Sequence, residues 1–216
     1  MADGLQASEL IDAFRALATP LISDNLARVP GAVGLRPFHR VSGVMAGRAL
    51  TVRTRPGDNQ FIHRALDLLQ PGDVIVVDGG GYEGRALVGE IMTSVAASRG
   101  AAGIVIDGAI RDAGAIGRSP FPCFARSAIH LGPYKDGPGA INVSVCVGGM
   151  VVGPGDIVVG DEDGVVAFPI DGATALLAAV RAQEAREVEI MTSIRENRYQ
   201  GAYAQKAPAS NGGHIE

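Results

Sequence analysis

The chain has 216 residues, of which 47% are hydrophobic and 19% charged, a composition that can bury a sizeable core and does not indicate disorder. The net charge is −4, the basic residues are scattered, aromatic residues make up 5% and Trp is absent, all of which argues against nucleic-acid binding. The longest apolar runs are too short to span a membrane, the acidic start is unlike a signal peptide, and Cys123 and Cys146 form no CxxC motif, so we expect a cytoplasmic protein with reduced thiols.

The first part of the sequence predicts short helices around one strand. Apolar residues at helical spacing indicate a helix over 9–17 capped by Ser8, and Thr19-Pro20 ends it. A second short helix is expected over 21–29. Residues 47–58 are typical of a strand that ends in a turn, and an amphipathic helix is expected over 59–69.

The segment 71–107 predicts a strand, a glycine loop, a helix and a second strand. "PGDVIVVDGGG" (71–81) contains a continuous apolar run, which is typical of a strand covered on both faces, and ends in a glycine cluster. A helix is expected from Glu90 to Gly100, and "GIVID" (103–107) is a second strand of the same kind. This order predicts two parallel strands joined by a crossover helix.

The second half of the sequence favours antiparallel hairpins followed by a long helix. Strands linked by Gly and Pro turns are expected within 122–128, 140–152 and 155–169. The acidic run 161–163 resembles a calcium loop but is more typical of a hairpin turn. A helix is expected over about 171–199 and a loose tail over 206–216. Because no linker is visible, we expect one α/β domain over 1–216, with a mixed sheet and a core over about 20–170.

Candidate functional residues follow the two predicted parallel strands, at 78–90 and 107–112. Ligands in open α/β folds gather beyond the carboxyl ends of such strands. The helix after Gly89 can offer unpaired N–H groups to an anion, and Arg111 supplies a planar fork that fits a carboxylate. Asp112 is a hard oxygen ligand suited to Mg²⁺ or Mn²⁺. Twenty residues separate Glu90 from Arg111, about one helix and one strand, so both can return to one cleft.

Together these residues predict a site for a small carboxylate beside a divalent metal ion. Backbone N–H groups and Arg111 would hold the carboxylate and an adjacent oxyanion, whose charge the metal would neutralise. A 2-oxo acid fits, because its carboxylate and keto oxygens chelate one metal. Two alternatives stay open: Arg111 and Asp112 can pair with neighbours at a surface turn, and the glycines 79–81 can be only a tight turn.

Three stretches resemble the RraA-like family, which includes the 4-hydroxy-4-methyl-2-oxoglutarate/4-carboxy-4-hydroxy-2-oxoadipate aldolases. They are residues 71–112, "FPCFAR" and "VVGPGDIVVGDEDGVVAFP", and the resemblance runs from about Ser23 to Pro169. Its most specific motif is an acidic residue, twenty residues and then Arg-Asp, here Glu90, Arg111 and Asp112. The family's aldolases often have Asp at the first of these positions, and its RNase E inhibitor lacks the Arg-Asp pair.

The resemblance implies a β/β/α swivelling-type sandwich with a mixed sheet and a C-terminal helix. It also implies homotrimers, or hexamers made of two trimers, and a divalent cation such as Mg²⁺ or Mn²⁺. It places Asp112 on the metal, mostly through waters, and Arg111 on the keto oxygen of pyruvate. The backbone N–H groups of Ile91 and Met92, which follow Gly89, would take the pyruvate carboxylate.

Several other residues are weaker candidates. The family's site lies between subunits, so the resemblance lets Glu187 or Glu189 of a neighbour's C-terminal helix approach the metal waters. Asp24 can be a helix cap or lie near the cleft, and Arg85 can add positive potential to the cleft. Asp107 can belong to a turn or orient Arg111.

We interpret the chain as a class II, metal-dependent pyruvate aldolase that cleaves a 4-hydroxy-2-oxo acid, with Arg111, Glu90 and Asp112 as catalytic residues. Oxaloacetate decarboxylation passes through the same pyruvate enolate and is expected as an activity. His63 is interpreted as a structural or surface residue. The alternative is a non-catalytic regulator that binds a protein partner such as RNase E. A small-molecule methyltransferase is disfavoured, because no S-adenosylmethionine motif is visible.

Overall fold

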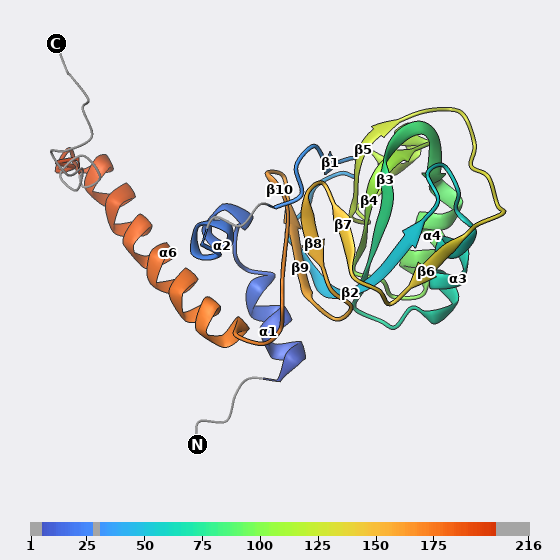
Figure 1. Ribbon diagram of the computed structural model, residues 1–216. Coiled ribbons are helices and arrows are strands. Elements are labelled where there is room, and N and C mark those ends of the chain that lie inside the picture. The colour runs from blue at the N-terminus through green and yellow to red at the C-terminus, as the bar shows by residue number, and fades with distance from the viewer. Residues whose placement is uncertain (1–5, 28–30, 202–216) are drawn as a thin grey trace, which may run out of the picture.

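A mixed sheet forms the centre of the structure, a computed structural model that describes residues 6–27 and 31–201 (Figure 1). The 8-stranded sheet has the order β1-β5-β4-β3-β2-β9-β10, with β6 also paired to β2. Strands β2 to β5 form a parallel core, β1, β6 and β9 pair antiparallel with it, and β10 pairs antiparallel with β9. The sheet strands are β1 (Arg36–Pro37), β2 (Met45–Thr54), β3 (Asp73–Val88), β4 (Gly103–Ile110), β5 (Cys123–Ala128), β6 (Gly139–Ile141), β9 (Ile157–Asp161) and β10 (Gly164–Phe168).

Helices cover one face of this sheet and a short hairpin covers the other. Because side chains alternate along a strand, Ile75 and Ile104 pack against α3, α4 and α5, while Val74 and Val105 pack against the hairpin of β7 and β8. This arrangement confirms the predicted mixed α/β sandwich. The remaining elements are α1 (Ala7–Phe14), α2 (Thr19–Asn25), α3 (Gln60–Leu68), α4 (Glu90–Ser98), α5 (Ala113–Ile116), α6 (Ala173–Arg195), β7 (Val145–Val147) and β8 (Met150–Val152).

A separate apolar cluster joins α1, α2 and α6 to the β9–β10 end of the sheet. The rings of Phe14 and Phe168 lie 4.8 Å apart, and Leu177 and Val180 of α6 are buried beside them. The second half of α6 projects away from the sheet (Figure 1), so side chains such as Val188 are exposed. The helix predicted over about 171–199 is present with slightly shorter ends.

The parallel core agrees with the prediction, except at the glycines. Val74 to Val77 and Ile104 to Ile106 are fully buried, as expected for strands covered on both faces. The predicted glycine loop is wrong: β3 continues through the glycines to Val88, with register shifts against β4 after Asp78. Pairing with β4 keeps this stretch extended, and the glycines let it bend.

Some predicted boundaries also differ. The first helix is capped at Gln6 and not at Ser8, and Thr19-Pro20 begins the second helix. The acidic run at 161–163 is the predicted hairpin turn, between β9 and β10. The tail at 206–216 lies outside the described residues. Within the described ranges, no helix is both long and apolar enough to cross a bilayer.

Candidate active site

Strand β3 leads directly into helix α4, and Gly89 lies at this junction. Gly89 is the N-cap residue, and the helix begins at Glu90. The first N–H groups of a helix have no acceptor within the helix, and the partial positive charge there favours an anion. Ile91 and Met92 carry such N–H groups, and both residues line a cleft beside the helix start. This end of α4 can therefore hold a carboxylate.

Arg111 and Asp112 follow β4 and reach the same place. The Arg111 N–H donates to Val88 O at 2.9 Å, which keeps the ends of β3 and β4 together. Asp112 has a φ of 56°, and its Oδ2 accepts the Glu90 N–H at 3.1 Å. The same Oδ2 lies 3.7 Å from Arg111 Nε. The Arg-Asp pair thus contacts the start of α4, and is not confined to an isolated surface turn.

Gly89 is the residue that permits this close contact. A Cβ atom at this position would lie 2.4 Å from Asp112 Oδ2 and 2.9 Å from Arg111 Cγ. Distances this short are not tolerated between non-bonded heavy atoms, so any side chain here would displace both functional groups. The packing of Arg111 and Asp112 against the helix start therefore depends on glycine.

A cleft of about 340 Å³ opens beside these groups. Of the predicted site residues, the Glu90 side chain does not line the cleft; it is exposed. A catalytic role for Glu90 therefore stays a prediction. The lining residues are Asn59, His63, Ala86, Leu87, Val88, Gly89, Ile91, Met92, Arg111, Asp112, Gly132, Pro133 and Lys135.

Sequence reasoning missed Asn59, which lies at the carboxyl end of β2 just before α3. Its side chain is 3% exposed, and its Nδ2 donates to Leu87 O at 3.0 Å. Its buried Oδ1 has no hydrogen-bond partner among the described residues. A buried acceptor without a donor costs free energy unless a ligand or water supplies one. The rule that placed Arg111 at a strand end applies equally to Asn59, and it would have found this residue.

His63 and Lys135 lie together on one side of the cleft. Partial burial lowers the pKa of His63 below its usual 6.5, the Lys135 ammonium lowers it further, and Asp67 opposes both effects. His63 is therefore neutral near pH 7. Within the described chain Lys135 makes no ion pair, so its positive charge is available to an anionic ligand. His63 was interpreted as a structural or surface residue; it is exposed, and it lines the cleft.

The donor set around Asp112 suits one kind of metal ion and not another. Within the described residues, no three His, Cys, Asp or Glu side chains gather closely enough to hold a metal. A zinc site, which needs three or four protein ligands, does not fit. Mg²⁺ commonly keeps several waters and binds through one or two carboxylates, so the exposed Asp112 carboxylate fits it.

A second group of carboxylates lies at the helical end of the molecule, away from α4 (Figure 1). The Gln183 side chain donates to Asp24 Oδ2 at 3.0 Å and to Glu187 Oε1 at 2.9 Å, and it accepts a hydrogen bond from Asn25 at 2.7 Å. Glu189 instead lies 3.9 Å from Arg198. The structure therefore brings Asp24 and Glu187 together, but it places neither beside Arg111 of the same chain.

Two other candidates have structural partners. Asp107 is buried, forms an ion pair with Arg126 and accepts the Gly148 N–H at 3.1 Å, so the idea that it orients Arg111 is wrong. Arg85 donates to Gly132 O at 2.7 Å and does not line the cleft.

Cys123 is no nucleophile, because burial raises the pKa of its thiol to about 12.

The fold and the site together define a class: an α/β sandwich with a cleft, beyond the carboxyl ends of its parallel strands, that is lined by an arginine and the start of a helix. Within this class the particular family is also clear. The family model described as "RraA-like: Aldolase/RraA" matches residues 19–167, and the chain belongs to the RraA-like family.

Known relatives agree with this assignment. A protein of Halalkalibacterium halodurans named "Putative 4-hydroxy-4-methyl-2-oxoglutarate aldolase" is 35% identical over 190 residues, which are 88% of this chain and 90% of that protein. A solved structure of an uncharacterized protein from Pseudomonas syringae pv. tomato is 28% identical, with a TM-score of 0.78 over 88% of this chain and 94% of that one. The structure titled "RNA-processing inhibitor RraA from Thermus thermophilis" is 31% identical, with a TM-score of 0.64 over 70% and 92%.

Proposed function

We propose that this protein is a cytoplasmic, divalent-metal-dependent lyase that releases pyruvate from a 4-hydroxy-2-oxo acid and also decarboxylates oxaloacetate. One observation carries the proposal: Arg111 and Asp112 contact the free N-terminus of α4 on the wall of a cleft of about 340 Å³. Such a cleft is large enough for a small acid, and its polar groups match a carboxylate next to a carbonyl.

The substrate's 2-oxo acid end binds at the start of α4. Its carboxylate accepts hydrogen bonds from the backbone N–H groups of Ile91 and Met92, and Arg111 donates to the keto oxygen. The rest of the substrate extends toward Asn59 and Lys135, which line the cleft beyond Arg111. Asn59 Oδ1, which lacks a donor, can accept the hydrogen bond of a substrate hydroxyl.

Bond cleavage then depends on stabilising negative charge at the keto oxygen. In oxaloacetate the carbon–carbon bond to the distal carboxylate breaks, CO₂ leaves and the electron pair forms the pyruvate enolate. In a 4-hydroxy-2-oxo acid a base, such as a water held by Glu90, removes the hydroxyl proton, and a carbonyl compound leaves. Water protonates the enolate carbon in both reactions. Arg111 stabilises the enolate oxygen, a role that typically contributes a factor of about 100 to 1000 in rate.

Asp112 would hold the divalent cation, Mg²⁺ or Mn²⁺, mostly through waters. When bound, the cation supplies further positive charge beside the carboxylate and keto oxygens. The resemblance to the aldolases of the family supports this role, and so does the exposure of the Asp112 carboxylate.

The second carboxylate group supports an assembly in which subunits share the site. We propose a homotrimer, or a hexamer of two trimers, in which the helical end of one subunit approaches the cleft of the next. Glu187, which Gln183 holds beside Asp24, is the better candidate to complete the site, because Glu189 lies beside Arg198. Closed symmetry would give every subunit an equivalent site.

This assembly has a direct test by subunit mixing. Arg111→Ala removes the guanidinium group that a subunit contributes to its own cleft. Glu187→Gln removes the carboxylate that a subunit contributes to the cleft of its neighbour. If the site is shared, mixing the two impaired variants under conditions that exchange subunits raises the activity above the average of the two variants alone, because some sites receive both intact groups. A mixture whose activity equals that average although subunit exchange is demonstrated would contradict a shared site.

The second candidate function is a non-catalytic regulator that binds a protein partner such as RNase E. The likeness to the RNA-processing inhibitor from Thermus supports it. The two functions separate in one experiment: pyruvate release from oxaloacetate, measured with Mg²⁺, with Mn²⁺ and with a chelator. Metal-dependent release supports the lyase. No release after metal reconstitution, or release that the chelator does not affect, rules out the proposed lyase and favours the regulator.

A further inference from the structure

One wall of the cleft is built by two segments that are distant in the sequence. Asn59 and His63 come from the start of α3, whereas Gly132, Pro133 and Lys135 come from the long connection between β5 and β6. This connection contains one isolated bridge, between Tyr134 and Asp58, and no regular strand. Some other interaction must therefore fix where Lys135 lies.

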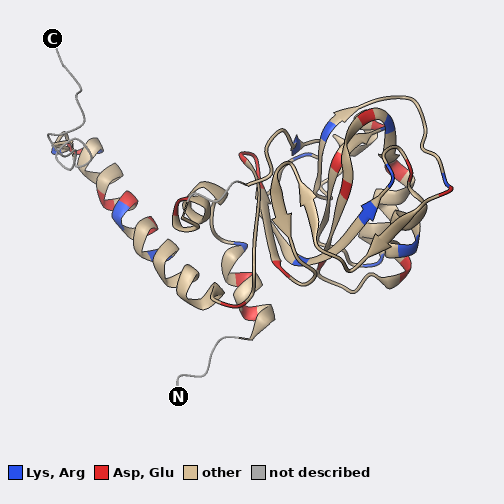
Figure 2. Cartoon of the chain, in the orientation of Figure 1, with Lys and Arg blue, Asp and Glu red and all other residues tan. Residues whose placement is uncertain are grey.

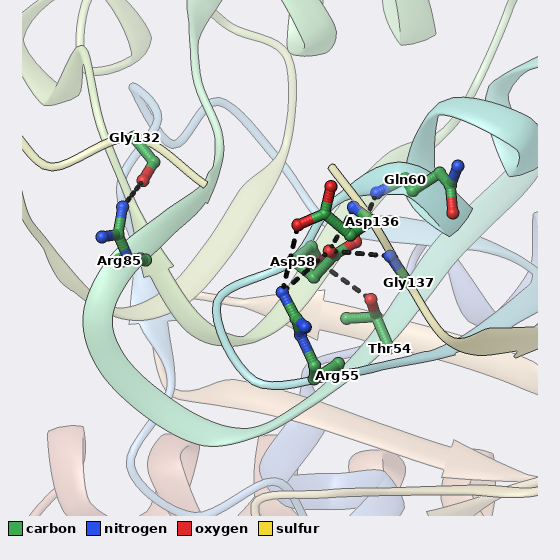
Figure 3. A network of polar contacts seen from close by, with 8 residues as sticks. All are labelled: Thr54, Arg55, Asp58, Gln60, Arg85, Gly132, Asp136 and Gly137. Carbon is green, nitrogen blue, oxygen red and sulfur yellow. Dashed lines mark hydrogen bonds and ion pairs between the residues drawn. The ribbon is translucent and has the colours of Figure 1, made fainter. Parts of the chain in front are cut away.

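Asp58 supplies that interaction (Figure 3). Its side chain is fully buried, its Oδ1 accepts the Gln60 N–H at 2.9 Å, and its Oδ2 accepts the N–H groups of Asp136 at 2.7 Å and Gly137 at 2.8 Å. One carboxylate thus binds both the first turn of α3 and the end of the 132–137 loop. Hydrogen bonds to a charged acceptor are stronger than neutral ones, and a buried carboxylate is costly to leave unpaired.

Further contacts fix the same loop. Tyr134 N donates to Gly57 O at 2.8 Å, and its carbonyl accepts the Asn59 N–H at 3.0 Å. The Arg85 guanidinium lies 3.9 Å from the centre of the Tyr134 ring. Lys135 therefore lies between two residues whose backbones are fixed, while its own ammonium makes no ion pair in the described chain. The Asp58 carboxylate is occupied by backbone donors and by Arg55, whose Nη2 lies 3.4 Å from its Oδ2, and it leaves the charge of Lys135 available.

We propose that Asp58 is a positioning residue that holds Lys135 and Asn59 together on the far wall of the cleft, and thereby sets substrate affinity without touching substrate. This inference rests on the proposed function. Because the Asp58 carboxylate contacts the start of α3 and the 132–137 loop, and neither Arg111 nor α4, loss of Asp58 should weaken binding more than it slows bond cleavage.

The test replaces Asp58 with Asn, which has nearly the same volume. One of the two acceptor oxygens becomes an NH₂ donor, which cannot accept the backbone N–H groups that Asp58 binds. Asp161→Asn is the matched control: Asp161 is also buried and binds the Thr19 and Asp163 N–H groups at 2.7 Å and 3.0 Å, but it lies outside the cleft. We expect Asp58→Asn to raise the KM for oxaloacetate roughly tenfold while kcat changes less than about threefold. Asp161→Asn should lower the Tm, as Asp58→Asn should, but it should leave the KM unchanged.

Two further measurements make the test specific. In a Lys135→Ala background, Asp58→Asn should raise the KM by less than about twofold, because residues that act through each other are not additive. In the absence of any substrate, NMR titration of His63 should show its pKa rising in Asp58→Asn, because the Lys135 ammonium moves away. This titration decides the positioning role even if the protein has no lyase activity, so the two proposals can fail separately.

Folded Asp58→Asn protein with an unchanged KM and an unchanged His63 titration would overturn the proposal, as would an equal rise in KM in Asp161→Asn. If Asp58→Asn does not fold, Arg85→Met removes the bond to Gly132 and the contact with Tyr134 instead. That variant should raise the KM about threefold, and a KM equal to that of the wild type would count against the proposal.

Discussion

Charged residues lie at both the cleft end and the helical end of the molecule (Figure 2). At the helical end, exposed charges pair with one another: Asp12 with Arg15, and Glu189 and Glu196 with Arg198. Exposed pairs of this kind contribute only about 0–1 kcal/mol each. At the cleft end, Arg111 lies 3.7 Å from Asp112 and Arg55 lies 3.4 Å from the buried Asp58, while Lys135 makes no ion pair in the described chain. The difference is that the charges of the cleft end lie at the wall of a cleft, where Lys135 is left for a ligand.

Both ends also expose apolar side chains. Ile91 is 76% exposed on the wall of the cleft, and Val188 is 61% and Met191 48% exposed on the projecting half of α6. Apolar surface on a projecting helix is typical of a contact with another chain. The two ends together support the proposed assembly, in which the cleft of one subunit takes a small ligand and the helical end of the next brings Glu187 to it.

The largest effect is expected at Arg111. Arg111→Ala and Arg111→Lys should both lower the kcat for oxaloacetate about 100- to 1000-fold, because Lys keeps the charge but loses the planar fork. The Tm should stay within a few degrees of wild type, since the side chain is about half exposed. Arg118→Ala is the control, an exposed arginine outside the cleft lining. Near-normal activity in Arg111→Lys would reduce Arg111 to a generic positive charge.

The second effect tests whether the cleft depends on a close backbone approach. Gly89→Ala should lower kcat/KM roughly 100-fold, because the new Cβ would displace Arg111 and Asp112 and small misplacements of reacting groups are costly. Gly114→Ala is the matched control, since a Cβ there would meet only Arg118 at 3.7 Å, an ordinary contact. Equal activity of the two variants would show that the Arg-Asp pair has freedom to adjust.

Much of the cleft end was predictable from local sequence, because its elements are consecutive. Buried apolar runs predicted the two parallel strands, and the strand-end rule placed Arg111, Asp112 and the start of α4 together. The glycine segment was misjudged, because pairing with β4 keeps it extended and no local pattern reports that pairing. Lys135 was not predicted, because Asp58 fixes its loop across a sequence separation of 78 residues.

The helical end was predictable as helices but not as an arrangement. The apolar spacing of α6 indicated a helix, and Leu177 and Val180 are buried as that pattern implies. The resemblance left Glu187 and Glu189 equivalent. The structure distinguishes the two through Gln183, whose side-chain amide hydrogen-bonds both Asp24 of α2 and Glu187 of α6. A hydrogen bond between elements far apart in the sequence has no signature that a single sequence can show.

The third prediction joins the two ends. Glu187→Gln should lower kcat roughly tenfold, the usual effect of removing a group that acts next to a metal's waters. Glu189→Gln should leave kcat within about twofold, because that residue makes only an exposed contact with Arg198. Sedimentation must show the same assembly for both variants. Equal losses in both would mean that α6 contributes surface charge in general and no specific acid.

The smallest expected effect is on stability against mild acid, and it concerns His39, which lies beside the start of β5. His39 is 8% exposed, and its Nδ1 accepts the Cys123 N–H at 3.1 Å. Burial lowers the pKa of His39 below 6.5 and outweighs the opposing backbone hydrogen bond. The neutral ring therefore stabilises the fold above about pH 6.5, and this contribution is lost as the pH falls toward the lowered pKa.

Asp58 does not titrate in this pH range. Burial would raise its pKa, but three backbone hydrogen bonds and Arg55 outweigh burial and hold the pKa below 3.8.

The measurement is the Tm of wild type and His39→Gln at pH 7.5 and pH 5.5. Wild type should lose a few degrees on acidification, and His39→Gln should lose less, since Gln can still accept the Cys123 N–H but does not titrate. A difference of about 1 kcal/mol corresponds to roughly 2–4 °C in a chain of this size. The described parts of α1, α2 and α6 contain no histidine, so this loss should originate at the sheet and not at the helical end. If His39→Gln loses as many degrees as wild type, the acid sensitivity belongs to another group, and His63 in the cleft is then the residue to replace.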